Sequence, residues 1–143
     1  MLSAPYTIEF GFERTTGPVV GAFLGGLRDG VLYGVRTNRG TVLCPAAEFD
    51  PETAEETTGE LVELAAEGTV QTWTWVPRRE ADQLSSDFAW ALITIDGTEN
   101  SLFHAVDNSG DMDSMHTGMR VRARWRDDRA GSISDIECFE PVP

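Results

Sequence analysis

The sequence predicts a mainly β protein with a single N-terminal helix. Five segments between residues 60 and 142 carry apolar and β-branched residues over strand lengths, and turn-forming residues separate them. The connection between the third and fourth segments is longer than a hairpin turn, and helical periodicity is found in residues 18–29. This pattern fits a five-stranded OB-type barrel, with an SH3-like barrel or a small β-sandwich as the alternative.

The predicted helix has recognisable start and stop residues. Thr15 or Thr16 is expected to cap it, Pro18 suits its first position, and Gly30 is expected to end it. One apolar stripe along this helix comprises Val19, Val20, Phe23, Leu24 and Leu27.

The other side of the helix consists mostly of small residues, namely Gly21, Ala22, Gly25 and Gly26. Each Gly costs about 1 kcal/mol relative to Ala in a helix interior, so helix propensity does not explain this face. Two interpretations remain open. Either the helix lies on its own domain with a bare outer side, or the small residues let the backbone of a partner approach closely.

The chain divides into residues 1–33, 34–59 and 60–143, which we expect to form one compact unit. Residues 31–60 contain Gly34, Gly40, Pro45 and Pro51, followed by several glutamates. These residues break regular structure, so a loop or a small irregular subdomain is predicted there.

The five strands are predicted at Gln71–Val76, which follows Gly68-Thr69-Val70, and at Phe88–Ile95, Ser101–Val106, Met119–Arg126 and Ile133–Phe139. Gly68 indicates a bulge or a sharp bend. Phe88–Ile95 is almost wholly apolar, which is typical of a strand covered on both faces. Met119–Arg126 alternates strictly, so Val121, Ala123 and Trp125 are expected inside the barrel and the arginines outside.

The composition excludes several function classes. The chain has 24 acidic and 11 basic residues and a formal net charge of −13, and all the basic residues are Arg. Without Lys, neither a Schiff-base mechanism nor a Walker A loop is available. The two cysteines do not make a disulfide framework, and no apolar run approaches the roughly 20 residues that span a bilayer. We therefore expect a cytoplasmic protein that contacts no membrane.

Few residues are candidates for chemistry. His104 is expected in a strand and His116 in a loop, and neither has a Ser, Cys or carboxylate partner at a motif spacing. The sequence therefore predicts no catalytic residue, no metal ligand set and no cofactor.

One arginine row can bind an anion: Arg120, Arg122, Arg124 and Arg126. A solvated face balanced by nearby acids is the simpler interpretation, and contact with an acidic partner or with CoA phosphates is the functional one. Because the predicted barrel also carries four Trp residues, single-stranded nucleic-acid binding is the alternative function. The net charge argues against nucleic acid as a partner.

Several segments together resemble a known family. They are Phe23–Gly30, Leu32–Arg36, Val42–Pro45, Gly68–Val70 and Gly118–Val121. Their order and spacing are similar to those of a family once filed as a domain of unknown function. Its members have an N-terminal helix, a rubredoxin-like zinc ribbon and an OB fold, and they accompany thiolases or lipid-transfer-protein-like acyl-CoA aldolases.

The resemblance implies that the ribbon here is degenerate and holds no metal. The positions that match the two Cys-x-x-Cys knuckles are Thr37 and Gly40, then roughly Asp50 and Thr53. Structural zinc needs four Cys or His ligands, and Cys44 lies outside the knuckle spacing. Residues 34–59 are therefore expected to form a ribbon-like segment without zinc.

The resemblance also implies a function. The chain would be a non-catalytic accessory subunit of an acyl-CoA aldolase (a lyase) or of a thiolase complex, in steroid or lipid side-chain degradation. A heterotetramer with a thiolase-fold dimer at its centre is expected, with acyl-CoA at or near the shared interface. The residues expected to contact the partner are Phe23, Gly25, Gly26, Arg28 and Arg36.

Overall fold

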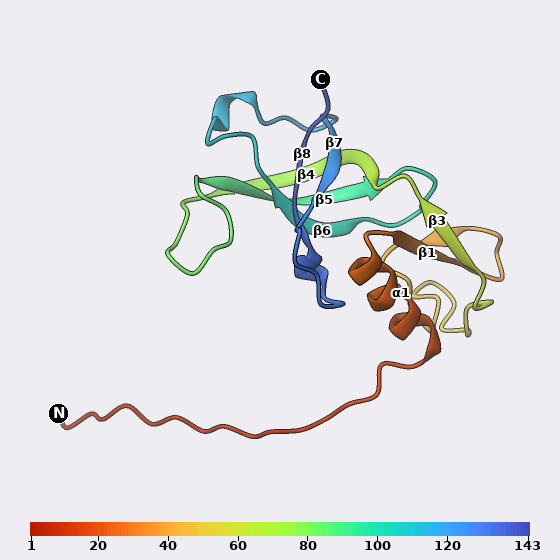
Figure 1. The fold of residues 1–143 in the computed structure, drawn as a ribbon, viewed down its shortest axis with the longest axis horizontal. Coiled ribbons are helices and arrows are strands. Elements are labelled where there is room, and N and C mark those ends of the chain that lie inside the picture. Colours follow the sequence, from red (N-terminus) through yellow and green to blue (C-terminus); the bar gives the residue numbers. More distant parts are fainter.

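The computed structural model describes residues 1–143 and contains one α-helix, eight strands and two short 3-10 helices (Figure 1). The elements are α1 (Pro18–Asp29), β1 (Leu32–Arg36), β2 (Val42–Leu43), β3 (Leu61–Leu64), β4 (Glu67–Val76), β5 (Phe88–Ile95), β6 (Leu102–Val106), η1 (Met112–Ser114), β7 (Arg120–Trp125), η2 (Ile133–Asp135) and β8 (Ile136–Pro141). The α-helix has 12 residues, and no helix is long and apolar enough to cross a membrane.

Five strands close into a barrel in the order β4-β5-β6-β8-β7, with β7 pairing back onto β4. All pairs are antiparallel except β6 with β8, which meet in parallel at Val106 and Phe139. This is the mixed, closed topology of an OB fold, so the predicted OB barrel is confirmed.

Gly68 allows β4 to approach β5 closely. A Cβ atom at this position would overlap the carbonyl oxygen of Thr94 and would lie 2.9 Å from Cγ2 of Ile93. The predicted bulge is present in the same strand, but it lies between Val70 and Thr72. The start of β4, residues 67–69, pairs with β7 on one side, and residues 68–76 pair with β5 on the other, with the bulge interrupting this second ladder.

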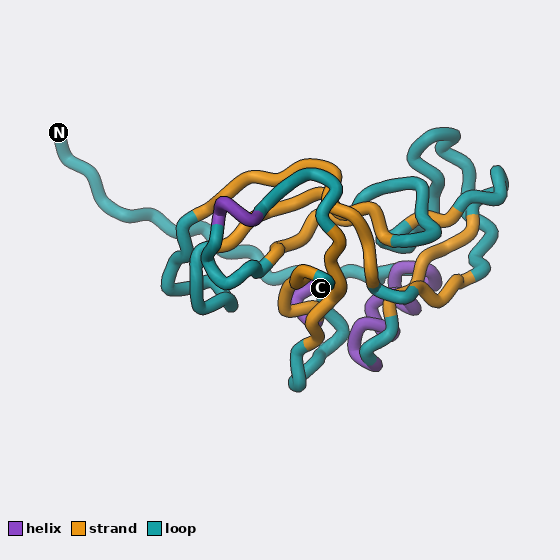
Figure 2. The backbone as a smooth tube through the Cα atoms, turned by 90° about the horizontal axis from the view of Figure 1, so that it is seen from above, coloured by secondary structure: helices purple, strands orange, loops and turns teal.

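A second, smaller sheet lies beside the barrel, next to α1 (Figure 2). Its strand order is β2-β1-β3, and β1 pairs antiparallel with both neighbours. The segment 31–60, predicted as a loop or a small irregular subdomain, thus contributes β1 and β2 to this sheet. β3 completes it immediately before the chain enters the barrel.

Helix α1 starts differently from the sequence prediction. Gly17 is the N-cap residue and makes no side-chain cap, so the predicted capping by Thr15 or Thr16 is wrong. Instead, Oε1 of Glu48 accepts hydrogen bonds from the backbone nitrogens of Val19 (2.9 Å) and Val20 (3.2 Å). Glu48 lies 29 and 28 positions away from these two residues in sequence, so the local sequence pattern does not predict that it satisfies their backbone donors.

A shared core joins the helix, the small sheet and the barrel. The largest cluster of buried apolar residues includes Phe23 and Leu27 of α1, Leu32 of β1 and Ile93 and Phe139 of the barrel. The helix therefore packs onto the rest of the chain with its apolar stripe. Residues 1–16 are exposed and extend away from this body (Figure 1).

Candidate functional site

An apolar face lies on the outside of the barrel along β5 and β6. Ala91 and Ile93 point inward and are at most 1% exposed, whereas Leu92 between them is 39% exposed. Phe103, which pairs with Leu92 across the two strands, is 58% exposed. The expectation that Phe88–Ile95 is covered on both faces is therefore wrong, because nothing packs over its outer side at Leu92.

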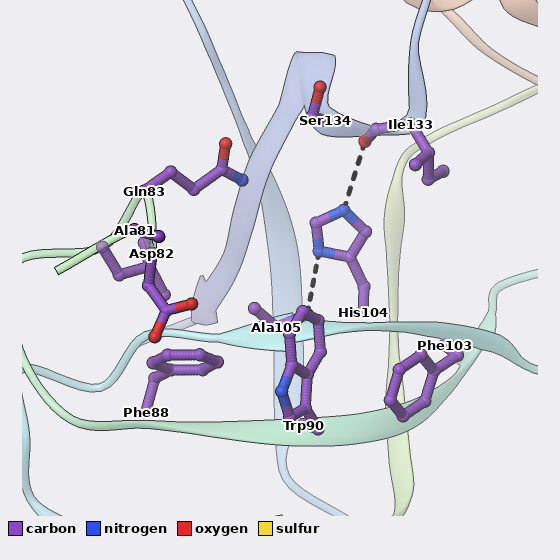
Figure 3. A pocket seen from close by; sticks show the side chains of 11 residues that line it. Ala81, Asp82, Gln83, Phe88, Trp90, Phe103, His104, Ala105, Ile133 and Ser134 are labelled. Carbon is purple, nitrogen blue, oxygen red and sulfur yellow. Dashed lines mark hydrogen bonds between the residues drawn. The ribbon is translucent and has the colours of Figure 1, made fainter. Parts of the chain in front are cut away.

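This face continues into a groove with a volume of about 390 Å³. Its floor is aromatic: the rings of Trp90 and Phe103 stack with centroids 5.1 Å apart, and Phe88 meets Trp90 edge-on at 5.3 Å (Figure 3). Its walls come from residues 81–84, between β4 and β5, and from Ile133 and Ser134, between β7 and β8. In OB folds, the second and third strands with these two loops form the usual ligand-binding surface.

His104 lies at the wall of the groove and is 6% exposed. Its Nδ1 accepts a hydrogen bond from the backbone nitrogen of Ala105 at 2.9 Å, so its Nε2 carries the proton and donates to the carbonyl oxygen of Ile133 at 3.3 Å (Figure 3). Burial lowers the pKa of His104 below its usual value of 6.5, which keeps the ring neutral. Both ring nitrogens are occupied, so His104 fixes the loop before β8, as expected for a packing histidine.

No Arg or Lys side chain lines the groove, and Nε of Arg78 donates to the backbone carbonyl oxygen of Leu84, a lining residue, at 2.9 Å. Asp82 lines the groove itself. The groove is thus a mainly apolar hollow, and Asp82 is the one acidic residue that lines it.

The predicted arginine row lies on the outside of β7, and its members face carboxylates. Arg120 lies 2.6 Å from Asp96, and Arg122 lies 3.0 Å from Glu140. Arg124 contacts three acids, at 2.6 Å from Glu137, 2.8 Å from Asp107 and 3.3 Å from Glu140.

Arg126 follows β7 and makes no ion pair in the chain. The other three guanidinium groups already bind carboxylates of this chain. The row therefore has fewer free donors for an external anion, such as a phosphate, than the sequence indicates.

The five residues predicted to contact a partner separate into two groups. Phe23 is 4% exposed within the core, and Gly26 is buried because the Tyr33 ring lies where its Cβ would be. Gly25 and Arg28 lie on the outer surface of α1, where a Cβ at Gly25 would have no atom closer than 4.0 Å. Arg36 lies at the end of β1 and pairs with Glu60 at 3.1 Å.

Ion pairs stabilise the ribbon-like segment at the positions where the resemblance places metal ligands. Arg39 lies within the first knuckle, between Thr37 and Gly40, and donates to both carboxylate oxygens of Asp50, at 2.9 Å and 3.3 Å. It also pairs with Glu99, on the turn that joins β5 and β6. This cluster of three charges, Arg39, Asp50 and Glu99, thus links the ribbon to the barrel.

Asp50 is 2% exposed, and its hydrogen bonds with Arg39 lower the pKa of its carboxyl group. Thr37 and Thr41 share a hydrogen bond of 2.7 Å in the first knuckle. No group of three His, Cys, Asp or Glu side chains that could hold a metal ion is formed by the 143 residues. Sequence reasoning missed the cluster because its members lie 11 and 60 residues apart.

Comparison with known proteins agrees with this architecture. Residues 61–126 match the family model described as the C-terminal OB-fold domain of ChsH2. A DUF35-family protein of unknown function from Sulfolobus solfataricus has a similar structure, with a TM-score of 0.59 and 16% identity over 85% of this chain and 83% of that chain. A chain described as "Ltp2-ChsH2(DUF35) aldolase" gives a TM-score of 0.63 and 15% identity over 90% of this chain and 98% of that chain.

At these identities, the two structures establish likeness of fold. The match over residues 61–126 adds a likeness of sequence, within the barrel, to the C-terminal OB-fold domain of ChsH2. No curated protein matches the sequence.

Proposed function

We propose that this chain is a non-catalytic accessory subunit of an aldolase complex. One observation carries the proposal: residues 61–126 match the ChsH2 C-terminal OB-fold domain, and a similar chain was solved as part of an Ltp2-ChsH2(DUF35) aldolase. The similarity to that chain extends over 98% of its length and over 90% of this chain, so it reaches beyond the barrel.

The side chains of this protein support the assignment of catalysis to a partner. Aldol cleavage needs a base that takes the proton of a β-hydroxyl group, and donors that stabilise the negative charge left on the other fragment. His104 uses both ring nitrogens for backbone contacts. Burial raises the pKa of Cys44 and of Cys138 to about 12, so neither thiol ionises readily.

In the finer form of the proposal, the partner is a thiolase-fold enzyme that cleaves the side chain of a CoA-linked steroid or lipid. Two copies of this chain would flank a partner dimer in a heterotetramer. The outer surface of α1 supports this role at Gly25, where the missing side chain leaves open space for another backbone. Acyl-CoA would bind near the shared interface, with Arg126 as the member of the arginine row that makes no ion pair within the chain.

Co-expression with the aldolase-type subunit from the same source tests this function. We expect a complex of fixed stoichiometry by size-exclusion chromatography with light scattering, and aldolase activity that requires the partner. This chain alone should show no cleavage of a β-hydroxyacyl-CoA. Cleavage by the isolated chain, or monomeric elution of both proteins after mixing, would contradict the proposal.

Single-stranded nucleic-acid binding is the second candidate, and one observation favours it. The stacked rings of Trp90 and Phe103 lie on the OB surface where bases stack in nucleic-acid-binding members. Asp82 in the lining of the groove and the net charge of −13 oppose it. We expect no change in anisotropy when the chain is titrated into a labelled oligothymidylate at physiological salt. Binding that is lost in Phe103→Ala would favour this second candidate.

A further inference from the structure

The N-terminal arm, residues 1–16, carries a strand pattern that the rest of the chain does not use. Four large apolar residues alternate along it, and each remains exposed: Tyr6 (85%), Ile8 (62%), Phe10 (82%) and Phe12 (83%). Thr7, Glu9, Gly11 and Glu13 occupy the alternate positions. In an extended chain, successive side chains point to opposite sides, so the arm has one apolar side and one acidic, polar side.

The backbone of the arm is also unpaired. No backbone or side-chain hydrogen bond involves residues 1–16, and the segment runs free of the body until Gly17 (Figure 1). A solvent-exposed strand with four large apolar side chains gains stability when a sheet edge pairs with its amides and a groove covers its apolar side.

The rest of this chain has no suitable binding site for the arm. The barrel is closed and has no free strand edge, and the edge strands of the small sheet are short: β2 has two residues, one of which already accepts a hydrogen bond from Glu99, and β3 has four. The outer groove of the barrel already carries Asp82, and the arm would bring Glu9 and Glu13 to the same surface. A second copy is disfavoured as well, because each chain carries a net charge of −13.

We propose that the arm docks as an added β-strand on the aldolase subunit, with Tyr6, Ile8, Phe10 and Phe12 in an apolar groove whose rim is neutral or basic. This inference rests on the proposed function and names the element that binds. It is continuous with the proposed contact surface, because the arm leads directly into α1.

The size of the apolar side agrees with a binding role. Aromatic side chains bury about 150–250 Å² each, so the three aromatics and the isoleucine would bury roughly 600 Å² on this side of the interface. A standard interface buries about 800 Å² per partner. The arm with the adjacent surface of α1 therefore suffices for a stable complex.

The test compares three proteins in binding to the purified aldolase subunit: the full chain, a variant that begins at Arg14, and a variant with Tyr6→Ser, Ile8→Ser, Phe10→Ser and Phe12→Ser. The arm makes no hydrogen bond to the body, so both altered proteins should melt at the temperature of the full chain. The matched control is Glu9→Gln with Glu13→Gln, which leaves the apolar side intact.

We expect affinity to fall roughly 100-fold or more in the shortened and serine variants, and less than about tenfold in the control. Equal binding by the full and shortened chains would overturn the arm proposal and leave the proposed function standing. Absence of binding by the full chain would overturn both.

Hydrogen exchange of the isolated chain and of the complex provides a second test of the arm proposal. We expect the amides of residues 6–12 to exchange freely in the isolated chain and to become protected in the complex. Protection in the isolated chain that does not depend on concentration would place the arm on its own barrel, and concentration-dependent protection would place it on a second copy. Either result would overturn the proposal.

Discussion

Nε of Arg39 lies 2.9 Å from Oδ2 of Asp50, and this ion pair joins the turn at residues 37–41 to the loop at residues 50–53. Asp50 is 2% exposed, and its carboxylate also accepts a hydrogen bond of 2.9 Å from the backbone nitrogen of Glu52. The Arg39 side chain therefore connects these two loops with each other and, through Glu99, with the barrel.

Arg39→Ala should loosen the ribbon-like segment. Asp50 would then be a buried carboxylate without its partner, so the melting temperature should fall by several degrees and the amides of residues 36–58 should exchange faster. Arg36→Ala is the matched control, because Arg36 and Glu60 form an exposed pair whose loss should have little effect. Equal melting temperatures for the two variants would show that the Arg39 cluster does not hold the ribbon.

Adjacent glycines of α1 should respond to alanine in opposite directions. Gly25→Ala adds a methyl group in open space and should raise the free energy of unfolding by about 0.5–1 kcal/mol. Gly26→Ala would place Cβ at 2.5 Å from the Tyr33 ring and 2.9 Å from the carbonyl oxygen of Val31, and should lower it by roughly 1–3 kcal/mol. Urea denaturation of the two variants measures both effects. The same sign in both would contradict the packing described for this helix.

Gly25→Glu should separate partner binding from folding. The position faces solvent in the isolated chain, so the variant should keep its melting temperature. At the proposed interface, the same change introduces a bulky charge and should prevent association with the aldolase subunit. Normal yield of the complex from co-purification would refute the contact at α1.

His104 should make the fold sensitive to mild acid. Burial lowers its pKa in the folded chain, whereas in the unfolded chain it has the usual value of 6.5. As the pH falls through about 6.5, the unfolded state takes up a proton that the folded state does not bind, so stability is complete above this pH and declines below it.

Urea midpoints measured between about pH 7.5 and pH 5 test this dependence. The decline should persist in His116→Gln, because His116 is exposed, and should disappear in His104→Gln. An unchanged slope in His104→Gln would assign the pH dependence to other groups.

Much of the fold was predictable because periodicity is local. The helix at residues 18–29 and four barrel strands were located from apolar spacing and turn residues, and the inward position of Val121 followed from alternation. The last strand was predicted at residues 133–139, but residues 133–135 form a 3-10 helix and β8 begins at Ile136. The start of α1 was mispredicted for a physical reason. The group that satisfies its first amides is Glu48, which reaches it only after the chain folds back.

The candidate site was less accessible to sequence reasoning. The aromatic content of the barrel was evident, but the stack of Trp90 with Phe103 depends on the pairing of β5 with β6. The exposure of Leu92 could not be predicted, because an apolar run in the sequence does not distinguish a strand covered on one face from a strand covered on both.

By itself, the sequence determined the helix at residues 18–29, the strands of the barrel and the exclusion of lysine chemistry. Only the tertiary structure decided that β3 pairs with β1, that β6 meets β8 in parallel, and that Arg39 binds both Asp50 and Glu99. The reason is physical: side-chain alternation is a property of neighbouring residues. Strand partners and ion pairs, in contrast, depend on which distant segments the closed barrel brings within a few ångströms of one another.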